Sequence, residues 1–210
     1  MSETAVREQI AMFGESLFNR GYGCGSSGNI SVRLDDGLLV TPTNSCMGRL
    51  DPARISKLDA TGRHIDGDKP SKEAFLHLAV YEERPEARAV VHLHSTHSVA
   101  VSCIDGLDPS NVLPPITAYY VMRVGRLPLV PYYRPGDTAL AEAVREIARE
   151  HHAMLLANHG PVVAGKALDA AVYSAEELEE TAKLFLLLRN EQVRLLTEEQ
   201  LAELAEAFPS

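Results

Sequence analysis

Two apolar runs that end in histidine constrain the fold of this chain most. The first is Ala89-Val90-Val91-His92-Leu93-His94-Ser95, which is rich in β-branched residues and typical of a buried strand. Residues two apart on a strand share a face, so we expect His92 and His94 to point at one spot. The second run, Met154-Leu155-Leu156-Ala157-Asn158-His159-Gly160, places His159 where another buried strand ends. We therefore expect a sheet with imidazoles gathered at strand ends.

Neutral imidazoles that converge from strand ends are typical ligands of a divalent transition metal. We predict that His92, His94 and His159 bind one Zn²⁺ per subunit and leave a coordination position open for chemistry. Manganese, cobalt or iron remain alternatives, because sites of three histidines follow metal supply as well as affinity. The competing interpretation is that three unrelated polar residues simply stand at strand termini.

Length and composition limit the class of protein. The 210 residues suit a single domain over 1–210, and a hydrophobic fraction of 45% with 23% charged residues is ordinary for a soluble globular protein. The net charge of -9 argues against nucleic acid or an anionic membrane surface as partner. We find neither a leader-like start nor an apolar stretch long enough to span a bilayer, so we expect a cytoplasmic protein.

The cysteines agree with that compartment. Cys24, Cys46 and Cys103 are odd in number and lack a CxxC spacing, which indicates free thiols in a reducing environment. Cys103 is expected in the core.

The order of elements predicts the fold class. Patterning indicates helices over 3–19, 71–81, 97–104, 137–150 and 168–194, and further strands over 29–34, 38–41, 55–58 and 63–65. The segment 114–131 matches neither pattern clearly. Helices interleave with strands, and tight turns join several strand pairs. We therefore predict an α/β protein with three α/β/α layers around a mainly antiparallel or mixed sheet.

Loops of unusual composition suggest an anion pocket. Asn29 follows a glycine- and serine-rich loop, and Thr43 and Asn44 lie in a second hydroxyl-rich turn. Ser71 is the expected N-cap of the helix over 71–81, where free N–H groups favour phosphate, and Lys72 adds a positive charge. Each loop alone is more typical of a plain turn, but together they predict a phosphate site.

Glu73 is the candidate general acid/base, in the first turn of the same helix. The alternative is an ordinary glutamate at a helix start. His77 follows one turn later, and we interpret it as a structural residue.

Five ordered motifs resemble one family along nearly the whole chain, the class II aldolases of the aldolase/adducin family. They are Ser27-Gly28-Asn29-Ile30-Ser31-Val32-Arg33, Val40-Thr41-Pro42-Thr43, Pro70-Ser71-Lys72-Glu73, His92-Leu93-His94-Ser95 and Asn158-His159-Gly160. The resemblance implies that the three histidines bind zinc, that Glu73 is the acid/base, and that a phosphate is held by Asn29, Thr43, Asn44 and Ser71. It also implies a homotetramer with sites at subunit interfaces. A neighbouring subunit would then supply a tyrosine, Tyr119 or Tyr120, although core packing or a rim contact is an equal alternative for either.

One departure points to a branch of this family. Lys72 precedes Glu73 where the sugar-phosphate aldolases usually have a serine, and this resembles the 3-oxo-tetronate 4-phosphate decarboxylases. The expected reaction converts a phosphorylated four-carbon keto acid into dihydroxyacetone phosphate and CO₂, through an enediolate that zinc stabilises. Lys72 or Arg123 would supply charge near the substrate.

Other functions stay open at this stage. An aldolase or epimerase of the fuculose- or ribulose-phosphate type would pass through the same enediolate. An adducin-like module would share the fold without catalysis. A zinc hydrolase has less support, because the chain has no His-Glu-x-x-His motif. The sequence does not distinguish the erythronate from the threonate series of substrates.

Overall fold

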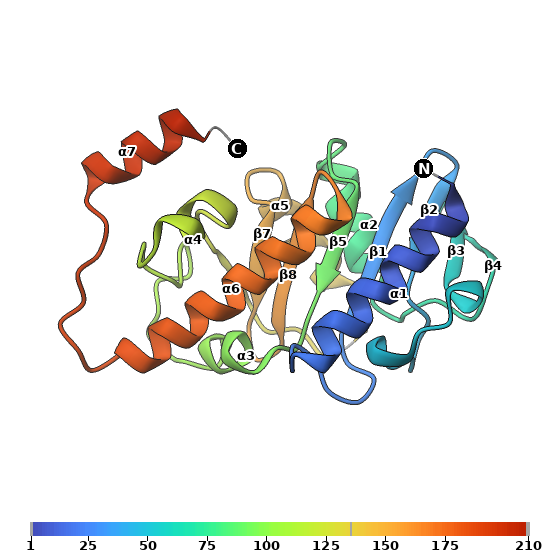
Figure 1. The fold of residues 1–210 in the computed structure, drawn as a ribbon, viewed down its shortest axis with the longest axis horizontal. Helices are drawn as coiled ribbons and strands as arrows, with labels where there is room; N and C mark the ends of the chain where they lie inside the picture. Colours follow the sequence, from blue (N-terminus) through green and yellow to red (C-terminus); the bar gives the residue numbers. More distant parts are fainter. Residues whose placement is uncertain (1, 135, 209–210) are drawn as a thin grey trace.

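The computed structural model describes residues 2–134 and 136–208 and contains an eight-stranded sheet (Figure 1). The spatial order is β4-β3-β2-β1-β5-β8-β7-β6. All neighbouring strands are antiparallel except β6 and β7, which are parallel. The strands are β1 Asn29–Leu34, β2 Gly37–Val40, β3 Ser56–Asp59, β4 His64–Asp66, β5 Ala89–His92, β6 Leu129–Val130, β7 Ala153–Leu156 and β8 Gly160–Gly165.

Helices cover both faces of the sheet (Figure 1). One face packs against α1, α3, α4 and α6, and the other packs against α2 and α5. The helices are α1 Glu3–Asn19, α2 Ala74–Glu83, α3 Thr96–Ser102, α4 Ala118–Arg123, α5 Ala139–Ala148, α6 Leu168–Leu188 and α7 Glu198–Ala207, with short 3₁₀ turns at Met47–Arg49 and Pro52–Arg54. The predicted three-layer α/β/α fold with a mixed sheet is therefore confirmed.

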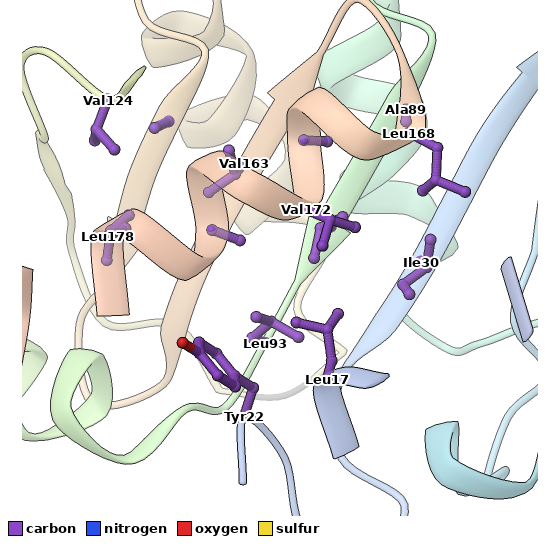
Figure 2. Packing of buried hydrophobic residues seen from close by; sticks show 14 of the residues in the cluster. Leu17, Tyr22, Ile30, Ala89, Leu93, Val124, Val163, Leu168, Val172 and Leu178 are labelled. Carbon is purple, nitrogen blue, oxygen red and sulfur yellow. The ribbon is translucent and has the colours of Figure 1, made fainter. Parts of the chain in front are cut away.

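The alternation of side chains along the central strands divides the core in two. On β5, Val91 belongs to the cluster under α1 and α6, whereas Val90 faces α2 and α5. Both valines are fully buried, which explains why β5 reads as a continuous apolar run rather than an alternating one. Figure 2 shows the first cluster, in which Val172 and Leu178 of α6 lie over Leu93 and neighbouring strand residues.

Local sequence predicted several elements closely and others only in part. The helix over 3–19 and the strand over 29–34 coincide with α1 and β1. The helix expected from Ser71 instead begins at Ala74, with Glu73 at the N-cap position. The Ser71 hydroxyl still accepts a hydrogen bond from the Glu73 N–H at 3.2 Å, so Ser71 stabilises the turn before the helix. The long last predicted helix ends at Leu188 rather than near residue 194.

Several other features differ from the sequence-based expectations or were left undetermined by them. Strand β8 and helix α7 were not predicted, and the undetermined segment 114–131 contains α4 and β6. The three cysteines are free thiols, as predicted, but Cys103 is exposed rather than in the core. It is the C-cap residue of α3, so it lies just beyond the buried Val101 and Ser102 and outside the apolar pattern of the helix. Within the described ranges, the helices are all too short or too polar to cross a membrane.

Candidate metal centre

The three predicted histidines meet at one edge of the central strands. The Nε2 atoms of His92 and His94 are 3.1 Å apart, and the Nε2 atom of His159 lies 3.3 Å from His92 and 3.1 Å from His94. The rings are nearly perpendicular to one another in two of the pairs and strongly inclined in the third. The three nitrogen atoms therefore form an almost equilateral triangle.

Strand pairing produces this triangle. β5 ends at His92, so His94 lies two residues beyond the strand rather than within it. β8 pairs with β5 through His92 and Val162, and the turn between β7 and β8 carries His159. That turn approaches the chain closely, because a Cβ on Gly160 would lie 2.2 Å from the Leu93 carbonyl oxygen. Only glycine allows the two histidine-bearing segments to lie this close.

The donor set fits a tetrahedral zinc ion. Zn–N bonds of 2.0–2.1 Å in tetrahedral geometry separate the nitrogens by about 3.3 Å, close to the spacing of this triangle. His92 also donates from Nδ1 to the Pro161 carbonyl oxygen at 2.8 Å, which leaves the Nε2 lone pair directed at the centre. Burial lowers the pKa of His92 to about 3, and this favours the neutral ring that a metal requires.

Glu73 completes the cluster. Its carboxylate oxygens lie 3.2 Å from His159 Nε2 and 3.5 Å from His92 Nε2, and the four donor atoms fall within 4.8 Å of one another. Burial raises the pKa of the Glu73 carboxyl, but the hydrogen bonds from His159 and Asn29, together with the electrostatic effect of the neighbouring imidazoles, outweigh it. The pKa of Glu73 therefore lies well below its usual value, and the group is a carboxylate in this arrangement.

Four of the five predicted phosphate residues lie in loops beside Glu73. The turn before α2 is tied to the loop after β2, because Ser71 N–H donates to the Thr41 carbonyl and Thr43 N–H donates to the Lys69 carbonyl. Asn44 adopts a left-handed conformation with φ of 57°. Lys72 is exposed and makes none of the ion pairs found among the described residues.

Asn29, the fifth of these residues, is buried and directly opposite His92 in the β1–β5 pair. Its Nδ2 donates to Glu73 Oε2 at 2.7 Å. Asn29 is therefore part of the surroundings of Glu73.

The two tyrosines proposed from the sequence, Tyr119 and Tyr120, lie outside the metal cluster. Tyr120 is buried in the core, and Tyr119 is 63% exposed in a cleft with Tyr173. The catalytic role of Tyr119 therefore stays a prediction that depends on a neighbouring subunit. A separate cleft of about 550 Å³ beside His94 and His159 is lined by Tyr132 and Tyr133.

Sequence analysis missed Tyr132 and Tyr133, because they follow a strand of two residues that carries little pattern. Arg123 does not line that cleft and instead packs its guanidinium over the Tyr173 ring. Its predicted role near the substrate therefore lacks support within one subunit.

Helix α3, which follows His94, is anchored by Glu179 of α6. The Glu179 carboxylate accepts hydrogen bonds from the N–H groups of His97 and Ser98 at 2.8 Å each, and from the His97 ring and the Ser98 hydroxyl. Burial raises the pKa of Glu179, but these donors outweigh it and keep the pKa below its usual value. The contact holds the start of α3 next to a metal-cluster residue.

We expect Glu179→Gln to destabilise the protein by about 1–3 kcal/mol, because the amide NH₂ cannot accept the hydrogen bonds that one carboxylate oxygen now accepts. Urea unfolding measures this loss. Glu180→Gln, at an exposed position of the same helix, should change the free energy of unfolding by less than about 0.5 kcal/mol. Equal stability of the two variants would contradict the anchoring role.

Comparison with known proteins places this geometry in a family. Residues 8–186 match the class II aldolase and adducin N-terminal domain. The 3-oxo-tetronate 4-phosphate decarboxylase of Escherichia coli strain K12 is 55% identical over 203 residues, covering 96% of each chain. The L-fuculose phosphate aldolase of the same strain is 35% identical over 212 residues, covering 99% of this chain and 96% of that one. The crystal structure of YgbL from Klebsiella pneumoniae superposes with a TM-score of 0.95 at 51% identity, covering 97% of this chain and 99% of that one.

The fold and the cluster together define a lyase of the class II aldolase type, with residues suited to a divalent metal. The chain belongs to the class II aldolase and adducin family. The resemblance stated from the sequence motifs is thereby confirmed, and so is the prediction of an enzyme, since relatives of 50–55% identity are named decarboxylases.

Proposed function

We propose that this protein is a zinc-dependent decarboxylase that converts a 3-oxo-tetronate 4-phosphate into dihydroxyacetone phosphate and CO₂. The observation that carries the proposal is the higher identity to relatives named for this activity, 50–55%, than to the L-fuculose phosphate aldolases, 35%. The cluster of Glu73, His92, His94 and His159 supports it, because decarboxylation next to a ketone needs a site that stabilises an enediolate.

The chemistry follows from the substrate. When the bond between C1 and C2 breaks, CO₂ leaves and its bonding electrons form an enediolate over C2 and C3. A zinc ion held by the three histidines would act as a Lewis acid toward the developing oxygen charge. We assign protonation of C2 to Glu73, which lies between the histidines and Asn29 and would have to be protonated for that step.

Substrate binding would use the loops beside Glu73. We assign the phosphate to Asn29, Thr43, Asn44, Ser71 and Lys72, because these residues combine amide, hydroxyl and ammonium donors at the start of β1 and in the two joined loops beside Glu73. We further propose a cytoplasmic homotetramer in which Tyr119 of one subunit reaches the site of the next. The exposure of Tyr119 supports that last assignment.

The test is a direct comparison of two substrate classes with zinc-loaded protein. One class is the 3-oxo-tetronate 4-phosphates of the erythronate and threonate series, and the other is ketose 1-phosphates such as L-fuculose 1-phosphate. Both yield dihydroxyacetone phosphate, so CO₂ and aldehyde must be measured separately. We expect enzyme-dependent CO₂ release from one keto acid, above the spontaneous rate measured without protein.

Aldehyde release from a ketose 1-phosphate with the higher kcat/KM would instead establish the aldolase. That second candidate is favoured by a TM-score of 0.89 to an L-fuculose 1-phosphate aldolase at 26% identity. Turnover of neither class by protein with stoichiometric zinc would refute both.

Lys72→Met is expected to raise KM for the phosphorylated substrate by about tenfold or more, with a smaller change in kcat. One charge-assisted hydrogen bond is worth about 1.5–3 kcal/mol, and each 1.4 kcal/mol is tenfold. Lys69→Met, which removes an exposed lysine from the same segment, is the matched control. Unchanged decarboxylation kinetics of the Lys72 variant would exclude Lys72 from substrate binding.

A further inference from the structure

A buried chain of hydrogen bonds runs behind Glu73, away from the open side of the cluster. Ser31 Oγ lies 2.6 Å from His77 Nδ1, His77 Nε2 contacts Asn29 Oδ1, and Asn29 Nδ2 donates to Glu73. Tyr81 closes the far end, with its hydroxyl 2.9 Å from Ser31 Oγ. Apart from Glu73, these side chains are buried, and His77 has no exposed surface at all.

We propose that His77 is a positioning residue that orients the Asn29 amide so that its NH₂ group, and not its carbonyl, faces the Glu73 carboxylate. The test has two parts. The kinetic measurements rest on the function proposed above, whereas the NMR measurements of the protons do not.

The direction of each hydrogen bond follows from the chemistry of the groups. A carboxylate only accepts, so Asn29 must turn its NH₂ toward Glu73 and its carbonyl oxygen toward His77. His77 must then carry its proton on Nε2. Burial lowers the pKa of His77 to about 4, so the ring is neutral and Nδ1 accepts from the Ser31 hydroxyl. One set of proton positions satisfies the whole chain.

The fold explains why His77 and Glu73 act on the same amide. Glu73 is the N-cap residue of α2, and His77 follows one turn later on the same side of the helix. Asn29 begins β1, and its amide lies between the two side chains. Without the His77 donor, the amide could rotate by half a turn and direct its carbonyl oxygen at the carboxylate. That repulsion would displace Glu73 from the histidine cluster.

The NMR measurements determine which ring nitrogen of His77 carries the proton. In protein labelled with ¹⁵N histidine, we expect His77 to be the neutral Nε2–H tautomer at pH 7, assigned by the loss of its signals in His77→Gln. The Asn29 side-chain amide signals should shift in His77→Leu. An Nδ1–H tautomer, an imidazolium, or unchanged Asn29 signals would overturn the proposal, whatever reaction the protein catalyses.

The kinetic measurements compare two variants of the same residue. His77→Leu removes the donor, whereas His77→Gln keeps an N–H near the position of Nε2. We expect kcat to fall about 10²-fold in the leucine variant and less than about tenfold in the glutamine variant, since small displacements of a reacting group cost about that much. Zinc content should stay unchanged in both, and KM should rise in the leucine variant alone, because Asn29 is also assigned to the substrate phosphate.

Val80→Ala separates positioning from loss of packing. Val80 is buried on the same helix and its apolar side chain forms none of the hydrogen bonds of the chain, so it reports the effect of loosening α2. We expect a lowered Tm with nearly full kcat. Equal losses of kcat in the leucine and glutamine variants, or a loss in Val80→Ala that matches His77→Leu at similar Tm, would show that His77 is only a core residue. If wild-type protein turns over neither substrate class, the function proposal fails, while the tautomer measurement still decides the role of His77.

Discussion

His94→Ala is expected to lose stoichiometric zinc and to lower kcat/KM by about 10³-fold or more. Three imidazole nitrogens at 3.1–3.3 Å spacing suit one tetrahedral ion, and removal of one leaves an incomplete set of ligands. The Lewis acid contributes several kcal/mol to stabilising charge, and each 1.4 kcal/mol is tenfold in rate. Metal analysis of the purified variant and the CO₂ assay measure the two effects.

The control for this variant is His64→Ala, which removes an exposed imidazole from β4, a strand at the far edge of the sheet. It should keep one zinc per subunit and full activity. A His94→Ala protein with stoichiometric zinc and unchanged kcat/KM would disprove the assignment of the metal centre.

Glu73→Gln should lower kcat by about 10²–10⁴-fold, the range that general acid/base catalysis contributes, with little change in KM. Glutamine has nearly the same shape but cannot transfer the proton that C2 of the product requires. Because three histidines remain, we expect the variant to retain zinc. Single-turnover formation of dihydroxyacetone phosphate, measured beside CO₂ release, reports the protonation step.

Glu82→Gln is the matched control on the same helix, since Glu82 is exposed and its ion pair with Arg145 lies on the surface. It should retain wild-type kcat. A decrease of less than about threefold in Glu73→Gln would exclude Glu73 as the acid. Loss of zinc from that variant would show that the carboxylate acts mainly as a fourth ligand.

Local sequence predicted those parts of the fold that depend on near neighbours. The amphipathic pattern of α1 and the alternation of β1 gave correct bounds, because each element contacts the core with one regular set of side chains. Ser71 was misjudged as an N-cap because its hydroxyl stabilises a turn just before the helix rather than the helix itself. Strand β8 was missed because Gly160, Pro161 and Gly165 weaken its strand pattern, while pairing with β5 and β7 stabilises it.

Some residues of the candidate site could likewise be predicted from the sequence, whereas others were found only in the structure. Sequence motifs identified the histidines and Glu73, and the structure brings all four together. His77 was interpreted as structural because its helix is apolar around it, and nothing local indicates that Asn29 lies against its ring. No local sequence pattern indicated a role for Tyr132 and Tyr133. Their place beside His94 depends on the pairing of β6 with β7.

The sequence by itself determined which donor groups this protein has and which short segments present them. Only the tertiary structure decided that His92 and His159, 67 residues apart, share a separation of 3.3 Å, because that distance depends on the pairing of β5 with β8 and on the close approach at Gly160. It likewise decided that Asn29 lies between His77 and Glu73. A local pattern specifies the face on which a side chain lies, whereas distances between side chains depend on strands and helices that are remote in the chain.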